Sequence, residues 1–137
     1  MLSVPPPLHE ITGDDGTVSA ARLGPHGTYL AYLNATPLQG DEQLNGWPEI
    51  RLEHLLDDDV RSDSEVSSAS MIPFRGGTGS CVIDTYVTRI GAHHYQEIAC
   101  LVQGRTSASV IVAATPAATW AQASPPLLRA VAAYQVR

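Results

Sequence analysis

Residues 80–134 read SCVIDTYVTRIGAHHYQEIACLVQGRTSASVIVAATPAATWAQASPPLLRAVAAY, and this stretch decides the fold. Three runs within it, 80–90, 93–103 and 107–115, are rich in β-branched and aromatic residues and contain no proline. Short glycine-containing linkers separate them, a pattern typical of consecutive strands joined by tight turns. The stretch therefore predicts an antiparallel meander followed by a helical segment, to which the earlier part of the chain adds further elements.

The pleat sorts this meander into two faces, because side chains two positions apart along a strand share a face. A two-residue turn at Gly91-Ala92, in which glycine supplies the positive φ, sets the expected register. The expected core face carries Cys81, Ile83, Val87, Ile98, Cys100 and Val102, and the opposite face carries Val82, Asp84, Tyr86, Tyr95, Glu97, Ala99 and Leu101. The mixed composition of the second face indicates either partial cover by another element or an exposed binding surface.

The two cysteines lie on the expected core face. In the register above, Cys81 and Cys100 are diagonal neighbours whose Cα atoms are roughly 7 Å or more apart, which is long for a disulfide. A turn at Ile90-Gly91 would instead place them directly opposite each other. We expect buried thiols, consistent with a reducing compartment.

The helical segment at the end of the chain is interrupted by prolines. Thr115-Pro116 and Ser124-Pro125 each place a hydroxyl at a helix N-cap before a proline at the first helical position. This predicts two helical segments rather than one unbroken helix. An apolar stripe that would cover one sheet face consists of Trp120, Leu127, Val131 and Tyr134.

The earlier part of the chain predicts an N-terminal arm, a hairpin, a helix and a further strand. Residues 1–12, with the run Pro5-Pro6-Pro7, form the expected arm, and residues 13–137 form one domain. The hairpin spans 16–36, with Tyr29 and Ala31 on one side and Leu30, Tyr32 and Asn34 on the other. A helix opens at Trp47-Pro48 with an apolar stripe of Leu52, Leu55, Leu56 and Val60, and a strand covers 65–74. The fold class is α+β, with a mainly antiparallel sheet of about six strands flanked by helices.

Three segments resemble the PsbP-like superfamily, which includes the photosystem II extrinsic protein, LpqN-type bacterial lipoproteins and a Ran-binding nuclear-import factor. They are TPAATWAQASPPLLRAVAAYQV at 115–136 and, more loosely, FRGGTGSCVIDTYV at 74–87 and WPEIRLEHLL at 47–56. The resemblance covers about the last two-thirds of the chain and implies an α/β/α sandwich. Its matching positions are packing positions, so it implies no catalytic or ligand-binding residue.

Composition excludes several classes of function. The 137 residues carry a net charge of -6, and 44% of them are hydrophobic, so the chain is long and apolar enough to fold as one domain. A nucleic-acid binder needs a basic footprint, which the acidic balance argues against. All eight basic residues are arginine, which is typical of a high-GC genome. The N-terminal segment has no cationic region followed by an apolar run, so we expect a cytoplasmic protein with no membrane association.

The acidic residues concentrate between positions 41 and 65, where only two arginines oppose them. The triple aspartate Asp57, Asp58 and Asp59 is near the expected end of a helix, where its charge opposes the helix dipole. Either the helix ends near Leu56 and the aspartates are solvated, or they face a cation or a basic partner. Together with Asp63, they form the candidate docking surface for a basic protein.

Two other positions are candidate contacts, Trp47 at the mouth of the first expected helix and Arg75 before the glycine-rich loop RGGTGS. Trp47 fits a packing anchor better than a ligand platform. The loop lacks the lysine and the following helix of a phosphate-binding loop, so it fits a hairpin connection, with Arg75 as an anion contact.

The sequence predicts no catalytic residue, metal site or cofactor. The histidines are scattered, and His93 and His94 point to opposite faces of one strand. The first-ranked function is a non-enzymatic accessory or protein-interaction module that uses an exposed sheet face or the acidic 41–65 face, with self-association left open. The alternative is a small-molecule or lipid carrier with a cavity between the sheet and the C-terminal helix. An enzyme that uses Asp84, Glu97 or a histidine as general base ranks third, because it requires carboxylates that converge in a cleft.

Overall fold

The computed structural model describes residues 1–11, 17–25, 28–38, 40 and 42–137. Within them, seven strands form one antiparallel sheet in the order β1-β2-β3-β7-β6-β5-β4. The strands are β1 (His9–Ile11), β2 (Val18–Leu23), β3 (Tyr29–Pro37), β4 (Val60–Phe74), β5 (Gly77–Thr88), β6 (His94–Gly104) and β7 (Ala108–Pro116), and the helices are α1 (Trp47–Asp57) and α2 (Trp120–Ala132). The α+β class and the antiparallel sheet are confirmed, with one strand more than expected because residues 9–11 of the predicted arm pair with β2.

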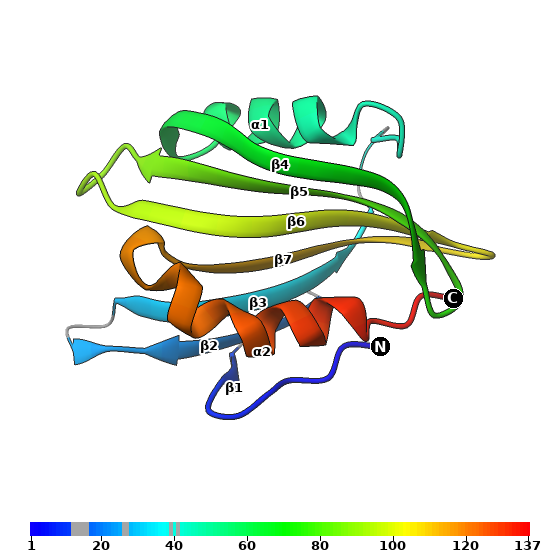
Figure 1. Ribbon diagram of the computed structural model, residues 1–137, viewed down its shortest axis with the longest axis horizontal. Helices are drawn as coiled ribbons and strands as arrows, with labels where there is room; N and C mark the ends of the chain where they lie inside the picture. The colour runs from blue at the N-terminus through cyan, green and yellow to red at the C-terminus, as the bar shows by residue number, and fades with distance from the viewer. Residues whose placement is uncertain (12–16, 26–27, 39, 41) are drawn as a thin grey trace.

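Two meanders meet in the middle of the sheet. The first runs through β1, β2 and β3, and α1 then carries the chain to the far edge, where β4 begins the second. The second meander returns through β5 and β6 to β7, which pairs with β3. Figure 1 shows the result: α1 lies at the β4 end of the sheet, and α2 lies in front of its middle strands.

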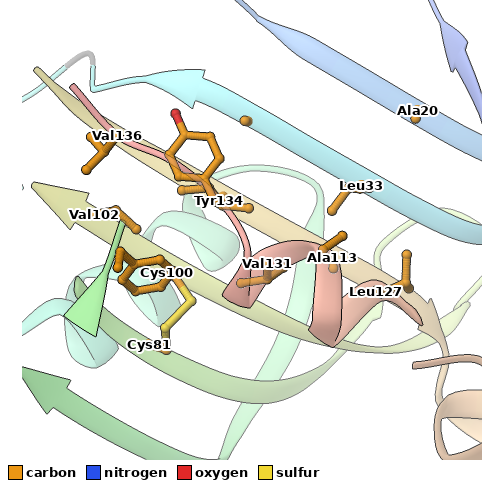
Figure 2. Packing of buried hydrophobic residues seen from close by; sticks show 14 of the residues in the cluster. Ala20, Leu33, Cys81, Cys100, Val102, Ala113, Leu127, Val131, Tyr134 and Val136 are labelled. Atoms are coloured by element: carbon orange, nitrogen blue, oxygen red, sulfur yellow. A yellow bond between two sulfur atoms is a disulfide. The ribbon is translucent and has the colours of Figure 1, made fainter. Parts of the chain in front are cut away.

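Helix α2 covers one face of the sheet, here called the α2 face. Leu127, Val131 and Tyr134 pack in one buried cluster with Leu33, Ile111 and the cysteines of β5 and β6, as Figure 2 shows in part. The predicted break at Ser124 is wrong: a short 3-10 turn, Ala117–Thr119, leads into a helix that continues through Pro125 and Pro126. These prolines cannot donate to the carbonyls of Ala121 and Gln122, but both residues are exposed, so water can solvate those carbonyls.

Helix α1 packs on the opposite face, here called the α1 face. Trp47 is 1% exposed and lies in a second buried cluster with Val82, Ala99, Leu101 and Val112. Its indole Nε1 donates a hydrogen bond to the Ala99 carbonyl at 3.0 Å. The prediction that Trp47 is a packing anchor is confirmed. The predicted stripe is only partly right, because Leu55 is buried whereas Leu56 is 39% exposed.

The two faces of the predicted meander are correct, but its register is shifted by two residues. Cys81 is opposite Cys100 and Ile83 is opposite Ile98, because the β5–β6 connection is a four-residue loop, 89–92, instead of a two-residue turn. Arg89 accounts for the longer loop. Its backbone N–H donates to the Asp59 carbonyl at 2.9 Å, and its guanidinium donates to the carbonyls of Leu56 and Val60, which ties the residue to the end of α1 instead of to β6.

The shifted register produces a disulfide. Cys81 and Cys100 are bonded, with their Cα atoms 4.1 Å apart, so the expectation of buried free thiols is wrong. The bond joins neighbouring strands within the buried cluster under α2, as the yellow link in Figure 2 shows. Side chains alternate between faces with a period of two, so a shift of two residues leaves every residue on its predicted face. The predicted core face is therefore correct although the predicted pairing is wrong.

Strand β4 begins at Val60, five residues earlier than predicted, so Asp63 belongs to the sheet and not to a connector. Most of the strand is exposed, since it forms the edge of the sheet. Its pairing with β5 is interrupted at three places, between Val60 and Ser62, Glu65 and Ser67, and Ala69 and Ile72. Such irregularities protect an edge strand from pairing with another chain. No helix in the described part of the chain is long and apolar enough to cross a membrane.

Candidate functional site

An uncovered part of the α1 face contains a hollow lined by aromatic side chains. Helix α1 lies mainly over β4 and β5, and its first residue, Trp47, reaches Val112 of β7. In the described part of the chain, no helix lies over the Tyr32 and Ala114 end of β3 and β7. Across this face the register places Tyr32 of β3 beside Ala114 of β7, and Ala114 beside Glu97 of β6. Cross-strand neighbours of this kind have their Cβ atoms about 5 Å apart. Because Ala114 is small, a depression remains between its larger neighbours.

The lining of this depression, here called the tyrosine hollow, comes from four strands, β3, β5, β6 and β7. Its volume is about 390 Å³, and its lining residues are Tyr29, Tyr32, Tyr86, Thr88, Tyr95 and Ala114. The rings form two pairs: Tyr29 and Tyr32 meet edge to face at 5.8 Å between centroids, and Tyr86 and Tyr95 are tilted at 5.6 Å. Phenol groups offer both an aromatic face and a hydrogen-bonding oxygen, so the hollow can bind apolar, polar and cationic groups.

The sequence placed Tyr29 and Tyr32 on opposite sides of their strand, and the structure brings them together. The pairing of β2 with β3 shifts at Leu23: Ala31 is opposite Arg22, whereas Tyr29 is opposite Leu23. Leu30 is thus an extra residue in β3, and it rotates Tyr29 onto the face of Tyr32. Tyr29 is 41% exposed, which makes it the accessible rim of the hollow.

A buried ion pair lies next to the hollow. Arg51 of α1 donates two hydrogen bonds to the Glu97 carboxylate, from Nε to Oε2 at 2.8 Å and from Nη2 to Oε1 at 2.9 Å. The side chain of Arg51 is 18% exposed and that of Glu97 is 1% exposed. Burial alone would lower the pKa of Arg51, but Glu97 outweighs it and the net direction is upward, so Arg51 stays charged. The pair fixes the middle of α1 to the centre of the sheet.

A second carboxyl group accompanies Glu97. Asp84 is directly opposite Glu97, is 0% exposed, and receives no hydrogen bond from any donor in the described part of the chain. Burial raises the pKa of Asp84 to about 9; the negative charge of Glu97 adds to the shift, and Arg51 opposes it. At neutral pH Asp84 is therefore protonated, directly beside the Glu97 carboxylate.

Two further groups face this carboxyl pair. Asp63 of β4 is opposite Tyr86, and burial together with Glu97 raises the pKa of the Asp63 carboxyl. Burial, again with Glu97 as the next cause, raises the pKa of the Tyr86 phenol. Tyr86 therefore stays a neutral donor. One arginine, Arg51, therefore lies among three carboxyl groups beside the tyrosine hollow. Each carboxyl group that Arg51 does not neutralise must either carry a negative charge or bind a proton.

The protonated state of Asp84 makes the stability of the fold depend on pH. The unfolded chain releases this proton near the ordinary pKa of 3.8, whereas the folded chain holds it until about 9. Between these values the folded state binds one proton more, so the free energy of unfolding falls as pH rises, by up to about 1.4 kcal/mol per unit. The variant Asp84→Asn has nearly the same shape as the wild-type residue but has no proton to lose. Urea unfolding between pH 5 and 9 should therefore show wild type losing stability relative to this variant as pH rises. Parallel curves for the two proteins would show that Asp84 is ionised in the fold.

The acidic turn at the end of α1 lies at the rim of the same hollow. Helix α1 ends at Asp57, and Asp57, Asp58 and Asp59 are all exposed, as the solvated alternative required. The turn leads into Val60, which pairs with the lining residue Thr88. The Arg89 guanidinium donates to the carbonyl of Leu56 in the last turn of α1 and to the carbonyl of Val60 at the start of β4, so it places a positive charge at the C-terminal end of the helix.

The remaining predicted contacts do not join this site. Trp47 is buried under α1 and offers no surface to a partner. Arg75 is exposed in the hairpin between β4 and β5, where its carbonyl accepts a hydrogen bond from the Val136 N–H and its residue bridges to Gln135. The glycine-rich loop thus forms a hairpin, as predicted.

A second, smaller depression lies on the α2 face. It is an apolar groove of about 240 Å³ between α2 and the strands β4, β5 and β6. Its lining includes Ile72, Ile83, Ile98, Leu128 and Val131. The groove is where the sequence placed the cavity of a carrier, between the sheet and the C-terminal helix.

The structure also places the candidate general bases. Asp84 and Glu97 do converge, but both are closed to solvent, so neither reaches a substrate in this conformation. Among the described residues, no group of three or more histidine, cysteine, aspartate or glutamate side chains is arranged to hold a metal ion. His26 lies outside the described residues.

Comparisons with known proteins identify the fold alone. No protein-family model matches the chain, and no curated protein matches it. Among solved structures, the chain resembles PA94 from Pseudomonas aeruginosa, described as a protein of unknown function and putative regulator, with a TM-score of 0.68. The sequences are 12% identical, and the match covers 98% of this chain and 89% of that one. The whole architecture is therefore shared with a solved protein, and the site must be interpreted from its own residues.

Proposed function

We propose that this chain is a non-enzymatic protein-interaction module that docks a partner with a basic surface at the tyrosine hollow. The observation that carries the proposal is the convergence of four tyrosines around an open depression, on a part of the sheet that no helix of the described residues covers. Tyrosine is enriched among the residues that dominate protein–protein binding energy, because it combines a large contact area with a polar tip.

Charge supports a basic partner. The protein has a net charge of -6, and the turn Asp57–Asp59 lies beside Thr88 at the rim of the hollow. Two surfaces that the sequence offered as alternatives, an exposed sheet face and the acidic segment, thus meet at one place. A basic partner would be steered by the aspartates and anchored by the tyrosines.

A random-peptide display selection against the wild-type protein tests this proposal. The enriched peptides are expected to contain arginine or lysine and to bind with micromolar affinity. Replacing Tyr29 by alanine should weaken their binding about tenfold, since one exposed anchor of this kind contributes about 1.4 kcal/mol. Met71→Ala, a change of another exposed residue on the edge strand β4, is the matched control and should leave affinity unchanged.

Charge is tested separately from the tyrosines. Asp58→Asn with Asp59→Asn should weaken binding at low salt and have little effect at high salt, because exposed charges are screened. Glu10→Gln with Glu49→Gln makes the same change in net charge at β1 and at the other end of α1, and should have no such effect. The proposal would be overturned if the selected peptides bound the tyrosine variant and the aspartate variant as tightly as they bind wild type.

The carrier function is a second candidate, favoured by the apolar groove at the place where the sequence predicted one. At about 240 Å³ the groove is smaller than the roughly 300–1,000 Å³ typical of small-molecule sites, which ranks this function second. Native mass spectrometry of gently purified protein distinguishes the two. Extra mass that disappears on denaturation would favour the carrier, and a clean apo mass would favour the docking module.

Membership of the PsbP-like superfamily is likewise a proposal. It is supported by the three sequence segments quoted above and by a fold in which one helix packs on each face of an antiparallel sheet.

The Cys81–Cys100 disulfide favours an oxidising compartment over the cytoplasm expected from the sequence, because cytosolic thiols are kept reduced.

A further inference from the structure

We propose that the tyrosine hollow is an aromatic cage for the guanidinium group of one arginine side chain of the partner, and that the buried carboxyl pair beside it supplies the counter-charge. This rests on the proposed function, which places a basic partner at the hollow, and adds the chemical group that enters it.

The walls of the hollow suit a flat cation. Tyr29 and Tyr32 form one side and Tyr86 and Tyr95 the other, with Ala114 between them in the sheet. A guanidinium is planar, stacks on aromatic rings and is more weakly hydrated than an ammonium. Aromatic faces attract cations within about 6 Å of the ring centroid, and arginine is found there more often than lysine.

The floor of the hollow is electrically suited to the same group. Ala114 is the direct cross-strand neighbour of Glu97, so a carboxylate lies one strand away from the centre of the cage. Glu97 accepts two hydrogen bonds from Arg51, which leaves lone pairs free on both of its oxygens. Asp84, one strand further, receives no donor at either oxygen from the described residues. A second guanidinium near this pair can take over the compensation that the proton on Asp84 provides in the unbound protein.

Binding should therefore release a proton. The groups that face Asp84 are Asp63 and Glu65 from β4, Glu97 and Tyr95 from β6, Tyr86 on its own strand, and Arg51 from α1. Among these groups of the described residues, only Arg51 is positive, and the proton on Asp84 compensates for the excess of carboxyl groups. An arriving cation favours the ionised form of Asp84, so affinity for the cation should increase with pH up to about 9.

The test is a titration followed by NMR of ring-labelled tyrosines. N-acetyl-arginine amide is compared with N-acetyl-citrulline amide, which has nearly the same shape without the charge, and with N-acetyl-lysine amide. The arginine compound should shift the resonances of Tyr29, Tyr32, Tyr86 and Tyr95 and should bind at least tenfold more tightly than the citrulline compound. Tyr134, which is buried under the α2 face, should not respond. Lysine should bind more weakly than arginine.

Two further results decide the inference. Between pH 6 and 9 the affinity for the arginine compound should increase severalfold in wild type and stay flat in Asp84→Asn. Equal binding of arginine and citrulline compounds, or equal pH profiles of the two proteins, would overturn the cage. Failure of the proposed function is distinguishable: selected peptides that depend on Tyr29 but contain no arginine would remove the cage and keep the docking surface. The opposite result would be that the arginine compound binds at the cage while Tyr29→Ala leaves the affinity of the selected peptides unchanged. That result would keep the cage and remove the docking surface.

Discussion

Replacing Arg51 by alanine should destabilise the fold by about 3 kcal/mol, at the lower end of the range for breaking a buried ion pair. Arg51 is the partner of Glu97, which is 1% exposed and cannot be solvated in place. Removing the guanidinium leaves Glu97 beside Asp84 with no positive charge among the groups that face them. The 18% exposure of the Arg51 side chain admits some water and keeps the loss below the upper limit.

Urea unfolding at pH 7 measures this effect, with Arg61→Ala as the matched control. Arg61 is an exposed arginine on β4, and its removal should change stability by no more than about 0.5 kcal/mol. The double variant Arg51→Met with Glu97→Leu removes both charges and should recover much of the loss, because two apolar side chains leave no unpaired charge. A loss below about 1 kcal/mol for Arg51→Ala would mean that Glu97 finds another partner.

Trp47→Ala should destabilise the fold by about 3–5 kcal/mol, as is typical of truncating a buried aromatic side chain. The indole is 1% exposed and packs against Val82, Ala99 and Leu101. The truncation opens a cavity between α1 and the sheet, and it also leaves the Ala99 carbonyl without its 3.0 Å donor. Trp47→Phe keeps most of the volume, so its smaller loss isolates the hydrogen bond.

The other tryptophan is the control for this experiment. Trp120 begins α2 and is only partly buried, so Trp120→Ala should cost less than half as much as Trp47→Ala. Thermal unfolding monitored by circular dichroism compares the two variants with wild type. If Trp120→Ala proved the more harmful, α1 would be a loosely attached element, and its role in holding Arg51 over Glu97 would fail with it.

The alternation of residues predicted both faces of β5 and β6, and hence most of the core, because a strand has a side-chain period of two. The pairing between those strands depended on the turn, and the turn depended on Arg89. Its hydrogen bonds join it to the end of α1 and the start of β4, about 30 residues earlier in the chain, and no local pattern reveals them. The disulfide depends on that pairing, because it places Cys81 opposite Cys100. The sequence analysis missed the disulfide because it could not detect the contacts of Arg89.

The candidate site was predictable in part. Asp84, Tyr86, Tyr95 and Glu97 were assigned to one mixed face that was expected to be partly covered or to bind a partner. The sequence could not identify Arg51 as the partner of Glu97. The two residues are 46 positions apart, and many other acidic residues could equally have paired with Arg51. Tyr29 was assigned to the wrong side because the extra residue in β3 has no signature in the sequence. A glycine or proline there would have indicated a bulge, whereas Leu30 does not.

A partner is proposed to dock at the tyrosine hollow and not at the groove under α2. NMR of a sample labelled on tyrosine rings and isoleucine methyl groups reports both places at once, because Tyr29, Tyr32, Tyr86 and Tyr95 line the hollow and Ile72, Ile83 and Ile98 line the groove. On titration with a peptide selected against the wild-type protein, the tyrosine resonances are predicted to shift and the isoleucine resonances to stay in place. Shifts confined to the three isoleucines would contradict the claim and assign the binding to the α2 face.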